Sequence, residues 1–176
     1  KESGCTLGAD IELTKVIPIG SGLGGGSSDA ATTLMALNQL WGLGFPQAKL
    51  LSLAVQIGAD VPFFIFGRSA FAEGIGEQLS LITLDPKFYL LITPKQSVFT
   101  AEVFGLAELT PKRKAITIQR FLGGEATGND LEEIVCSKHP EIEGCLNWLR
   151  KFGEARMTGS GGTVFCEFDS KLEAEN

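Results

Sequence analysis

The chain has 176 residues, 44% of them hydrophobic and 20% charged, and a formal net charge of −6 at pH 7. This acidic balance argues against a nucleic-acid partner held by a general basic field, and the one basic cluster, residues 112–114, fits a solvated turn. We also expect no membrane partner, since no apolar run has the length of a membrane span and no signal segment opens the chain. The four cysteines are scattered and the one histidine, His139, precedes a proline, which predicts neither a disulfide framework nor a zinc site.

The first part of the chain predicts a strand and then a helix. Residues 9–16 alternate between apolar and polar side chains, as in a half-buried strand. Ser27 and Ser28 are candidate caps of a helix that runs to about Trp41. Because strands and helices both follow along the rest of the chain, we expect an α+β fold.

A second helix is expected to begin near Pro46 and to end at Gly58. Strands are predicted around residues 69–73 and 88–93, and the second is apolar enough to be buried on both faces. The helix carries an apolar stripe that reads as core, made of Leu50, Leu53, Ala54 and Ile57.

A domain boundary is expected at Asp85, Pro86 and Lys87, which divides the chain into domains of residues 1–85 and 86–176. The second domain ends with a strand over residues 163–168, preceded by a glycine turn at 159–162 that is equally well explained as a tight hairpin. Its helical patterns cover residues 100–109, 117–122, 129–138 and 141–151.

The stretch of residues 18–31, Pro-Ile-Gly-Ser-Gly-Leu-Gly-Gly-Gly-Ser-Ser-Asp-Ala-Ala, is the strongest functional signal. Five glycines directly ahead of a helical pattern let backbone N–H groups approach an anion, and the helix N-terminus adds unpaired donors and a positive dipole end. The pattern predicts a cradle for the phosphates of a nucleotide.

Other glycine loops fit less well. A P-loop requires Lys and then Ser or Thr after its last glycine, but Ser27 follows Gly26. The spacing Gly20-x-Gly22-x-x-Gly25 matches a dinucleotide fingerprint, yet no acidic residue stands about 20 positions further on. A helix follows instead of the strand of a protein-kinase loop. A simple connection between strand and helix, without a ligand-binding role, remains an alternative explanation of the glycine stretch.

Asp60 is the second candidate for chemistry, because this single carboxylate lies between a helix end and the hydrophobic run of residues 61–66. Such a carboxylate can accept the proton of a substrate hydroxyl that attacks phosphorus. The alternative is a turn cap or a partner of a buried donor, which is common for aspartate at such a turn.

These motifs together resemble the GHMP kinase superfamily, and within it the branch that acts on 4-diphosphocytidyl-2-C-methyl-D-erythritol in non-mevalonate isoprenoid biosynthesis. The glycine stretch is similar to the ATP phosphate loop, residues 58–63 to the segment with the catalytic aspartate, and residues 157–165 to the third motif. The resemblance covers nearly the whole chain. It implies a ribosomal-protein-S5-domain-2-like N-terminal domain and a ferredoxin-like C-terminal domain.

The resemblance also implies roles for single residues. Asp60 is expected to be the general base for the 2-hydroxyl of the methylerythritol, and Phe104 to stack on the cytosine, although from spacing alone Phe104 is as well explained as a core aromatic. ATP and Mg²⁺ are the expected cofactors, with no metal ligand assigned beyond the candidate Ser28. Residues 129–131 are expected to cap a helix. The ATP loop comprises Pro18, Gly20, Ser21, Gly22, Leu23, Gly24, Gly25, Gly26, Ser27 and Ser28, and the substrate set Thr100, Phe104, Gly159, Ser160 and Gly161.

Two departures from the family qualify this interpretation. The first motif, a Pro-Ala-Lys-Leu-Asn-like segment whose lysine pairs with the catalytic aspartate, does not occur in these residues, and neither Lys15 nor Lys49 is expected to replace it. The family's last helix and strand are also not found after Asn176. We therefore expect the 176 residues alone to be inactive. The whole protein is expected to be bacterial and cytoplasmic, and to be a monomer or a homodimer.

Two alternatives stay open from the sequence. A sister GHMP kinase for homoserine, mevalonate or a sugar would keep both glycine loops but is expected to lack the context of Asp60 and the Phe104 segment. A non-catalytic nucleotide-binding protein would keep the phosphate loop and lose the base, whereas Asp60 is present.

Overall fold

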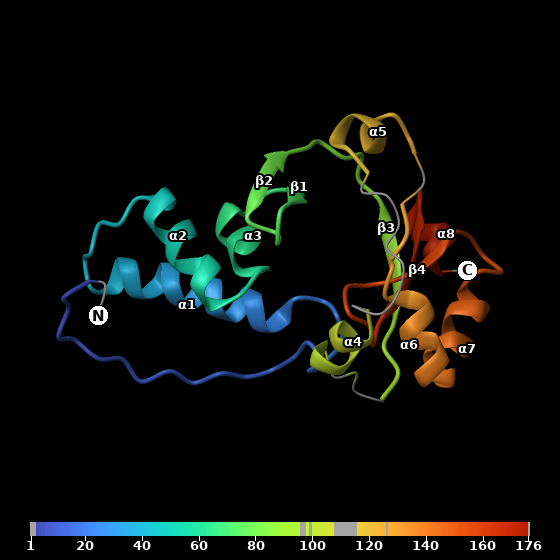
Figure 1. Ribbon diagram of the computed structural model, residues 1–176, viewed down its shortest axis with the longest axis horizontal. Coiled ribbons are helices and arrows are strands. Elements are labelled where there is room, and N and C mark those ends of the chain that lie inside the picture. Colours follow the sequence, from blue (N-terminus) through green and yellow to red (C-terminus); the bar gives the residue numbers. More distant parts are fainter. Residues whose placement is uncertain (1–2, 96–97, 99, 108–115, 126, 176) are drawn as a thin grey trace. The chain divides into compact units, whose positions relative to one another are not determined.

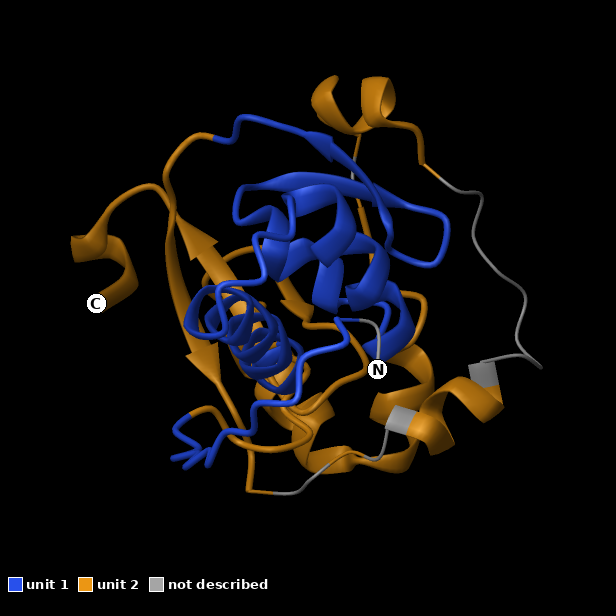
Figure 2. Ribbon diagram, turned by 90° about the vertical axis from the view of Figure 1, so that its left-hand side faces the viewer, with its two compact units in different colours: residues 1–16, 24–84 blue, residues 17–23, 85–176 orange. Residues whose placement is uncertain are grey.

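A computed structural model describes residues 3–95, 98, 100–107, 116–125 and 127–175, with only the backbone of Thr100 and Ala107. Helices and strands occur in both halves of the chain, which confirms the α+β prediction (Figure 1). The chain divides into two compact units: unit 1 comprises residues 1–16 and 24–84, and unit 2 residues 17–23 and 85–176 (Figure 2). None of the described helices is long and apolar enough to cross a membrane.

In the described residues, unit 1 consists of three helices and a two-stranded antiparallel sheet: α1 (Gly25–Leu40), α2 (Gln47–Ile57), α3 (Val61–Phe66), β1 (Ala70–Glu73) and β2 (Gln78–Leu81). The short α3 packs against both longer helices. Buried side chains from all three helices form the core: Ala31, Leu50, Ala54, Val61 and Ile65.

Unit 2 is built on a three-stranded antiparallel sheet with the strand order β3-β5-β4. Its elements are β3 (Phe88–Ile92), α4 (Thr100–Ala107), α5 (Ile118–Leu122), α6 (Glu132–Lys138), α7 (Pro140–Leu149), β4 (Ala155–Met157), β5 (Val164–Phe168) and α8 (Lys171–Glu175). Helix α7 packs on β4 and β5, and α6 packs on α7. The core joins α6, α7 and the sheet through Val135, Ile142, Leu146, Leu149 and Val164.

The strand predicted over residues 9–16 is not formed. Within the part of the chain that the structure describes, this segment pairs with no strand, and its apolar side chains Ile11 and Leu13 are 62% and 57% exposed. An alternating pattern supports a strand only where a neighbouring strand takes up its backbone hydrogen bonds.

Three further details differ from the sequence prediction. Gly24, in the left-handed conformation, precedes α1, so Ser27 and Ser28 lie inside its first turn and do not cap it. Ile57, which was predicted to belong to the core stripe of α2, is 55% exposed at the end of that helix. Strand β3 is not buried on both faces, because it lies at an edge of the sheet with Tyr89 and Leu91 about half exposed.

Candidate functional site

The N-terminus of α1 is the part of the glycine loop that belongs to unit 1. The amide of Ser28 donates to the carbonyl of Gly24 over 2.9 Å, which closes the first turn of the helix. The three amides before it, those of Gly25, Gly26 and Ser27, have no acceptor among the described residues, as helix geometry requires. These free donors at the positive end of a 16-residue helix suit an anion such as phosphate.

Gly24 and Gly26 lack side chains for different reasons. A Cβ on Gly24 would lie 2.8 Å from Cζ of Phe64, so this glycine permits close packing of α1 against α3. A Cβ on Gly26 would meet nothing within 4 Å, and its φ is not in the left-handed region. Packing explains Gly24 but not Gly26, whose open surroundings leave room for a ligand.

Asp60 is the residue directly before α3 and is exposed. No hydrogen bond or ion pair to its carboxylate occurs in the described part of the chain, so the expectation of a turn cap or a buried partner is not met. Asp60 and Phe64 are four residues apart and share a face of the helix, and Phe64 contacts Gly24. The free carboxylate thus belongs to the helix face that packs at the start of α1.

Lys15 forms an ion pair with Asp29 in the first turns of α1. Lys15 is therefore bound to the helix that follows the glycine loop. Among the described residues, no ion pair joins Lys15 to Asp60. The expectation that Lys15 does not replace the lysine of the missing motif stays a prediction.

The glycine turn at residues 159–162 connects β4 and β5, which confirms the hairpin interpretation. The amide of Thr158 donates to the carbonyl of Thr163 over 2.9 Å, and that of Gly161 donates to the carbonyl of Thr158 over 3.0 Å. Gly159, Gly161 and Gly162 all have positive φ. The turn therefore requires glycines for its backbone conformation.

Residues 17–23, the first part of the glycine loop, pack against this turn within unit 2. A Cβ on Gly22 would lie 2.3 Å from the carbonyl oxygen of Thr158, and one on Gly162 would lie 2.4 Å from that of Gly20. The hydroxyl of Thr158 donates to the carbonyl of Gly22 over 2.7 Å. Close approach of two backbone segments accounts for these glycines. It brings residues 17–23 of the glycine loop into contact with the glycine turn of residues 159–162.

Asn129 shows a contact that sequence reasoning missed. Its Oδ1 accepts a hydrogen bond from the amide of Leu131 over 3.0 Å in the turn before α6, but the helix has Leu131 at its N-cap and no side-chain cap, so the capping role expected for residues 129–131 is not met. Its Nδ2, however, donates to the carbonyls of Met157 and Gly159 over 3.0 and 2.7 Å. The contact joins residues about 30 positions apart, and no local pattern indicates it.

The aromatic ring of Phe104 on α4 is 53% exposed, which contradicts its interpretation as a core aromatic. The ring is therefore available for stacking. The side chain of Thr100 lies outside the described part, and the role expected for it stays a prediction.

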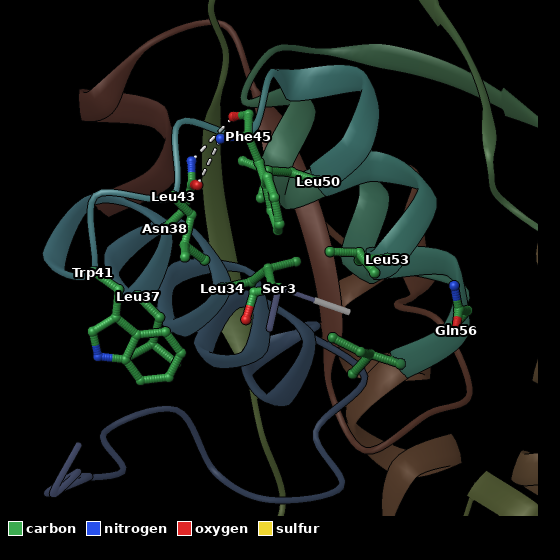
Figure 3. Close-up of a pocket in the computed structure, with 11 residues that line it drawn as sticks. Ser3, Leu34, Leu37, Asn38, Trp41, Leu43, Phe45, Leu50, Leu53 and Gln56 are labelled. Atoms are coloured by element: carbon green, nitrogen blue, oxygen red, sulfur yellow. Dashed lines mark hydrogen bonds between the residues drawn. The ribbon is translucent and has the colours of Figure 1, made fainter. Parts of the chain in front are cut away.

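A separate apolar pocket of about 290 Å³ lies between the C-terminal part of α1, the following loop and α2 (Figure 3). Nδ2 of Asn38 donates to the carbonyl of Phe45, and its Oδ1 accepts from the backbone amide of Phe45, which holds the loop beside the pocket. None of the predicted site residues lines it. The pocket is thus distinct from the start of α1.

Two family models match the sequence of this chain. The model of the GHMP kinases N terminal domain matches residues 1–68, and the model of the GHMP kinases C terminal matches residues 106–176. The chain belongs to the GHMP kinase family.

Two curated relatives show which members of the family the chain is similar to. The chain is 50% identical to the 4-diphosphocytidyl-2-C-methyl-D-erythritol kinase of Burkholderia multivorans over 182 residues, which cover 98% of this chain and 62% of that protein. The protein of the same name from Aromatoleum aromaticum is also 50% identical, over 98% of this chain and 61% of its own length. The chain thus spans about three fifths of the curated relatives it matches.

A crystal structure of 4-(cytidine 5'-diphospho)-2C-methyl-D-erythritol kinase is similar to the structure of this chain, with a TM-score of 0.71 and 35% sequence identity. The match covers 92% of this chain and 62% of that one. The two-domain GHMP kinase fold expected from the sequence is thereby confirmed.

Proposed function

We propose that the protein containing this chain transfers the γ-phosphate of ATP to the 2-hydroxyl of 4-diphosphocytidyl-2-C-methyl-D-erythritol. The names of the relatives at 50% identity support the substrate. The observation that carries the chemistry is the unpaired carboxylate of Asp60, on the helix face that packs at the free N-terminus of α1.

The residues at the start of α1 fit a nucleotide phosphate. The free amides of Gly25, Gly26 and Ser27 are donors for phosphate oxygens, and the open surroundings of Gly26 give a phosphate room to approach. We assign the same binding role to the other loop residues that the resemblance implies, although packing explains why Gly22 and Gly24 lack side chains. These residues are Pro18, Gly20, Ser21, Gly22, Leu23, Gly24 and Ser28. No cluster of three metal-ligating side chains occurs among the described residues, and Ser28 is the candidate protein ligand of Mg²⁺.

Asp60 acts as the general base. Its carboxylate accepts the proton of the 2-hydroxyl while that oxygen forms a bond to the γ-phosphorus, and the bond from phosphorus to the β–γ bridging oxygen breaks to release ADP. Because no other group occupies the carboxylate in the described residues, it is free to receive this proton. Mg²⁺ supplies neutralisation of the phosphate charge when bound.

We assign binding of the phosphoryl acceptor, the cytidyl substrate, to two parts of unit 2. The exposed ring of Phe104 on α4 binds the cytosine by stacking. Thr100, the first residue of α4, is assigned to the same substrate. Gly159, Ser160 and Gly161 close the site near the phosphoryl acceptor. Their turn is held by its own backbone hydrogen bonds, which supports a fixed surface at this position.

A panel of acceptors tests the substrate. ADP release by the full-length protein is measured with ATP, Mg²⁺ and either the cytidyl substrate, homoserine, mevalonate or galactose. We expect release with the cytidyl substrate alone and a clear loss of apparent affinity for it in Phe104→Ala. Release with one of the other acceptors would replace the proposed substrate with that of a sister kinase.

A further inference from the structure

We propose that Asn129 and Glu132 are positioning residues that hold the glycine turn of residues 159–162 in the conformation required for phosphoryl transfer. The inference rests on the proposed function, and it assigns a catalytic consequence to side chains outside the three sequence motifs. All the contacts involved lie within unit 2.

The two side chains bind one residue, Met157, the last of β4. In the sheet order β3-β5-β4, β4 is an edge strand, so every second residue directs both its amide and its carbonyl away from β5. At Met157 the amide donates to Oε2 of Glu132 over 3.2 Å, and the carbonyl accepts from Nδ2 of Asn129 over 3.0 Å. Both backbone groups of this edge residue are therefore satisfied by side chains at the start of α6.

Each of these side chains is itself held in place. Oδ1 of Asn129 accepts from the Leu131 amide, which fixes the orientation in which Nδ2 faces the strand. Oε1 of Glu132 accepts from Nη2 of Arg150 over 2.7 Å. The start of α6 is thus a preorganised clamp rather than a pair of mobile surface groups.

The clamp extends from the strand into the turn. Nδ2 of Asn129 also donates to the carbonyl of Gly159 over 2.7 Å, its shortest contact. Gly159 lies against the glycine loop, because a Cβ at this position would be 3.0 Å from the carbonyl oxygen of Gly22. Thr158, between the two clamped residues, donates its hydroxyl to the same Gly22 carbonyl. A shift of the clamp therefore displaces both glycine segments.

A purely local role as a helix or turn cap makes a different prediction. Asp in place of Asn129 keeps the acceptor for the Leu131 amide, but it puts a carboxylate oxygen against the carbonyls of Met157 and Gly159. A cap alone tolerates Asn129→Asp, because aspartate and asparagine are equally good caps. A clamp does not tolerate it, because the donor is lost and replaced by repulsion.

The test uses the full-length protein with Asn129→Asp and Glu132→Ala, and with Glu133→Ala as the matched control. Glu133 neighbours Glu132 on α6 but is exposed, and it forms no hydrogen bond or ion pair with β4 among the described residues. Three readouts are taken: kcat, the Kd for ATP, and hydrogen exchange of the amides of residues 158–163. Thermal unfolding shows that each variant is folded.

We expect kcat to fall at least tenfold in Asn129→Asp and Glu132→Ala, with faster exchange in the turn and a Kd for ATP within about threefold of the wild type. Glu133→Ala is expected to match the wild type in all three readouts. If Asn129→Asp does not fold, Glu132→Ala decides the result.

Two results would overturn the inference: a kcat within threefold of the wild type in both clamp variants, or unchanged exchange in the turn. A wild-type protein without kinase activity would instead reject the proposed function, and with it the catalytic part of this inference. The exchange data would then still decide whether the two side chains hold the turn.

Discussion

At the scale of single residues, the glycines fall into two physical classes. Gly22 and Gly162 face backbone atoms of the opposite glycine segment, so a side chain at either position collides with the protein itself. Gly26 faces open space with ordinary backbone geometry. The sequence alone attributes all the glycines of the loop to a phosphate, whereas the structure attributes part of them to packing.

Alanine substitutions separate the two classes. Gly22→Ala combines a positive φ with a contact of 2.3 Å to Thr158, and we expect it to lower the free energy of unfolding by roughly 2–4 kcal/mol. Gly26→Ala removes a flexible residue from a helix, so stability is expected to stay equal or rise by about 0.5–1 kcal/mol.

Urea unfolding of both variants, with ATP titrations, checks this pair. Gly26→Ala is expected to weaken ATP binding about tenfold although it is not destabilising, because the methyl group occupies the space assigned to a phosphate. Equal stability of the two variants, or undiminished ATP binding by Gly26→Ala, would contradict the division into classes.

Two thiols in unit 2 are expected to react slowly. Burial, followed by the charges of Glu132 and Glu143, raises the pKa of Cys136, and burial followed by Glu167 raises the pKa of Cys166. A raised pKa lowers the thiolate fraction at pH 8, so alkylation of both is expected to be slower than that of a free thiol.

Mass spectrometry of iodoacetamide-treated protein measures these rates, with the urea-unfolded protein as control. Both rates are expected to increase as the pH rises toward the elevated pKa values. The raised values also predict that folding stability falls as the pH rises through the ordinary thiol pKa, because the unfolded chain then loses protons that the folded one keeps. Labelling of Cys166 at pH 8 as fast as that of a free thiol would refute the prediction.

At the scale of elements, apolar periodicity predicted the longer helices and the strands β1, β3 and β5, whereas β2 and α8 were not predicted although both have partners in the chain. The stripe containing Leu50 and Ala54 identified α2, and the pattern around Ile142 and Leu146 identified α7. Residues 9–16 show the pattern of a strand but have no strand to pair with in the described residues. Helix α3 was not predicted, because a run of six apolar residues shows no period.

The candidate site was predictable to a similar extent. The phosphate loop and Asp60 carry local signals of residue type and spacing, so the sequence identified them. The contacts of Asn129 with Met157 and Gly159 depend on tertiary structure, and an asparagine before a helix reads as a cap in any sequence.

The core of α7 gives a direct test of packing in unit 2. Leu146 is 1% exposed and contacts the sheet core, so Leu146→Ala is expected to cost about 2–5 kcal/mol of unfolding free energy. Glu143→Ala, on the exposed face of the same helix, is expected to change it by less than about 0.5 kcal/mol. Urea denaturation measures both, and a similar cost at the two positions would contradict the assignment of the buried face.

At the scale of the whole molecule, the chain contains matches to both GHMP kinase domains but spans about three fifths of its curated relatives. Catalysis is therefore proposed for the full-length protein. Unit 1 holds the start of α1 and Asp60, and unit 2 holds the glycine turn and Phe104.

The most direct test of this account is ADP release by the full-length protein with ATP, Mg²⁺ and 4-diphosphocytidyl-2-C-methyl-D-erythritol, measured beside Asp60→Asn. Asparagine keeps the size of the side chain and removes its capacity to accept the proton. We predict substrate-dependent release that falls by a factor of about 10²–10⁴ in the variant, with ATP binding retained. No substrate-dependent release by the wild type, or equal release by the variant, would contradict the account.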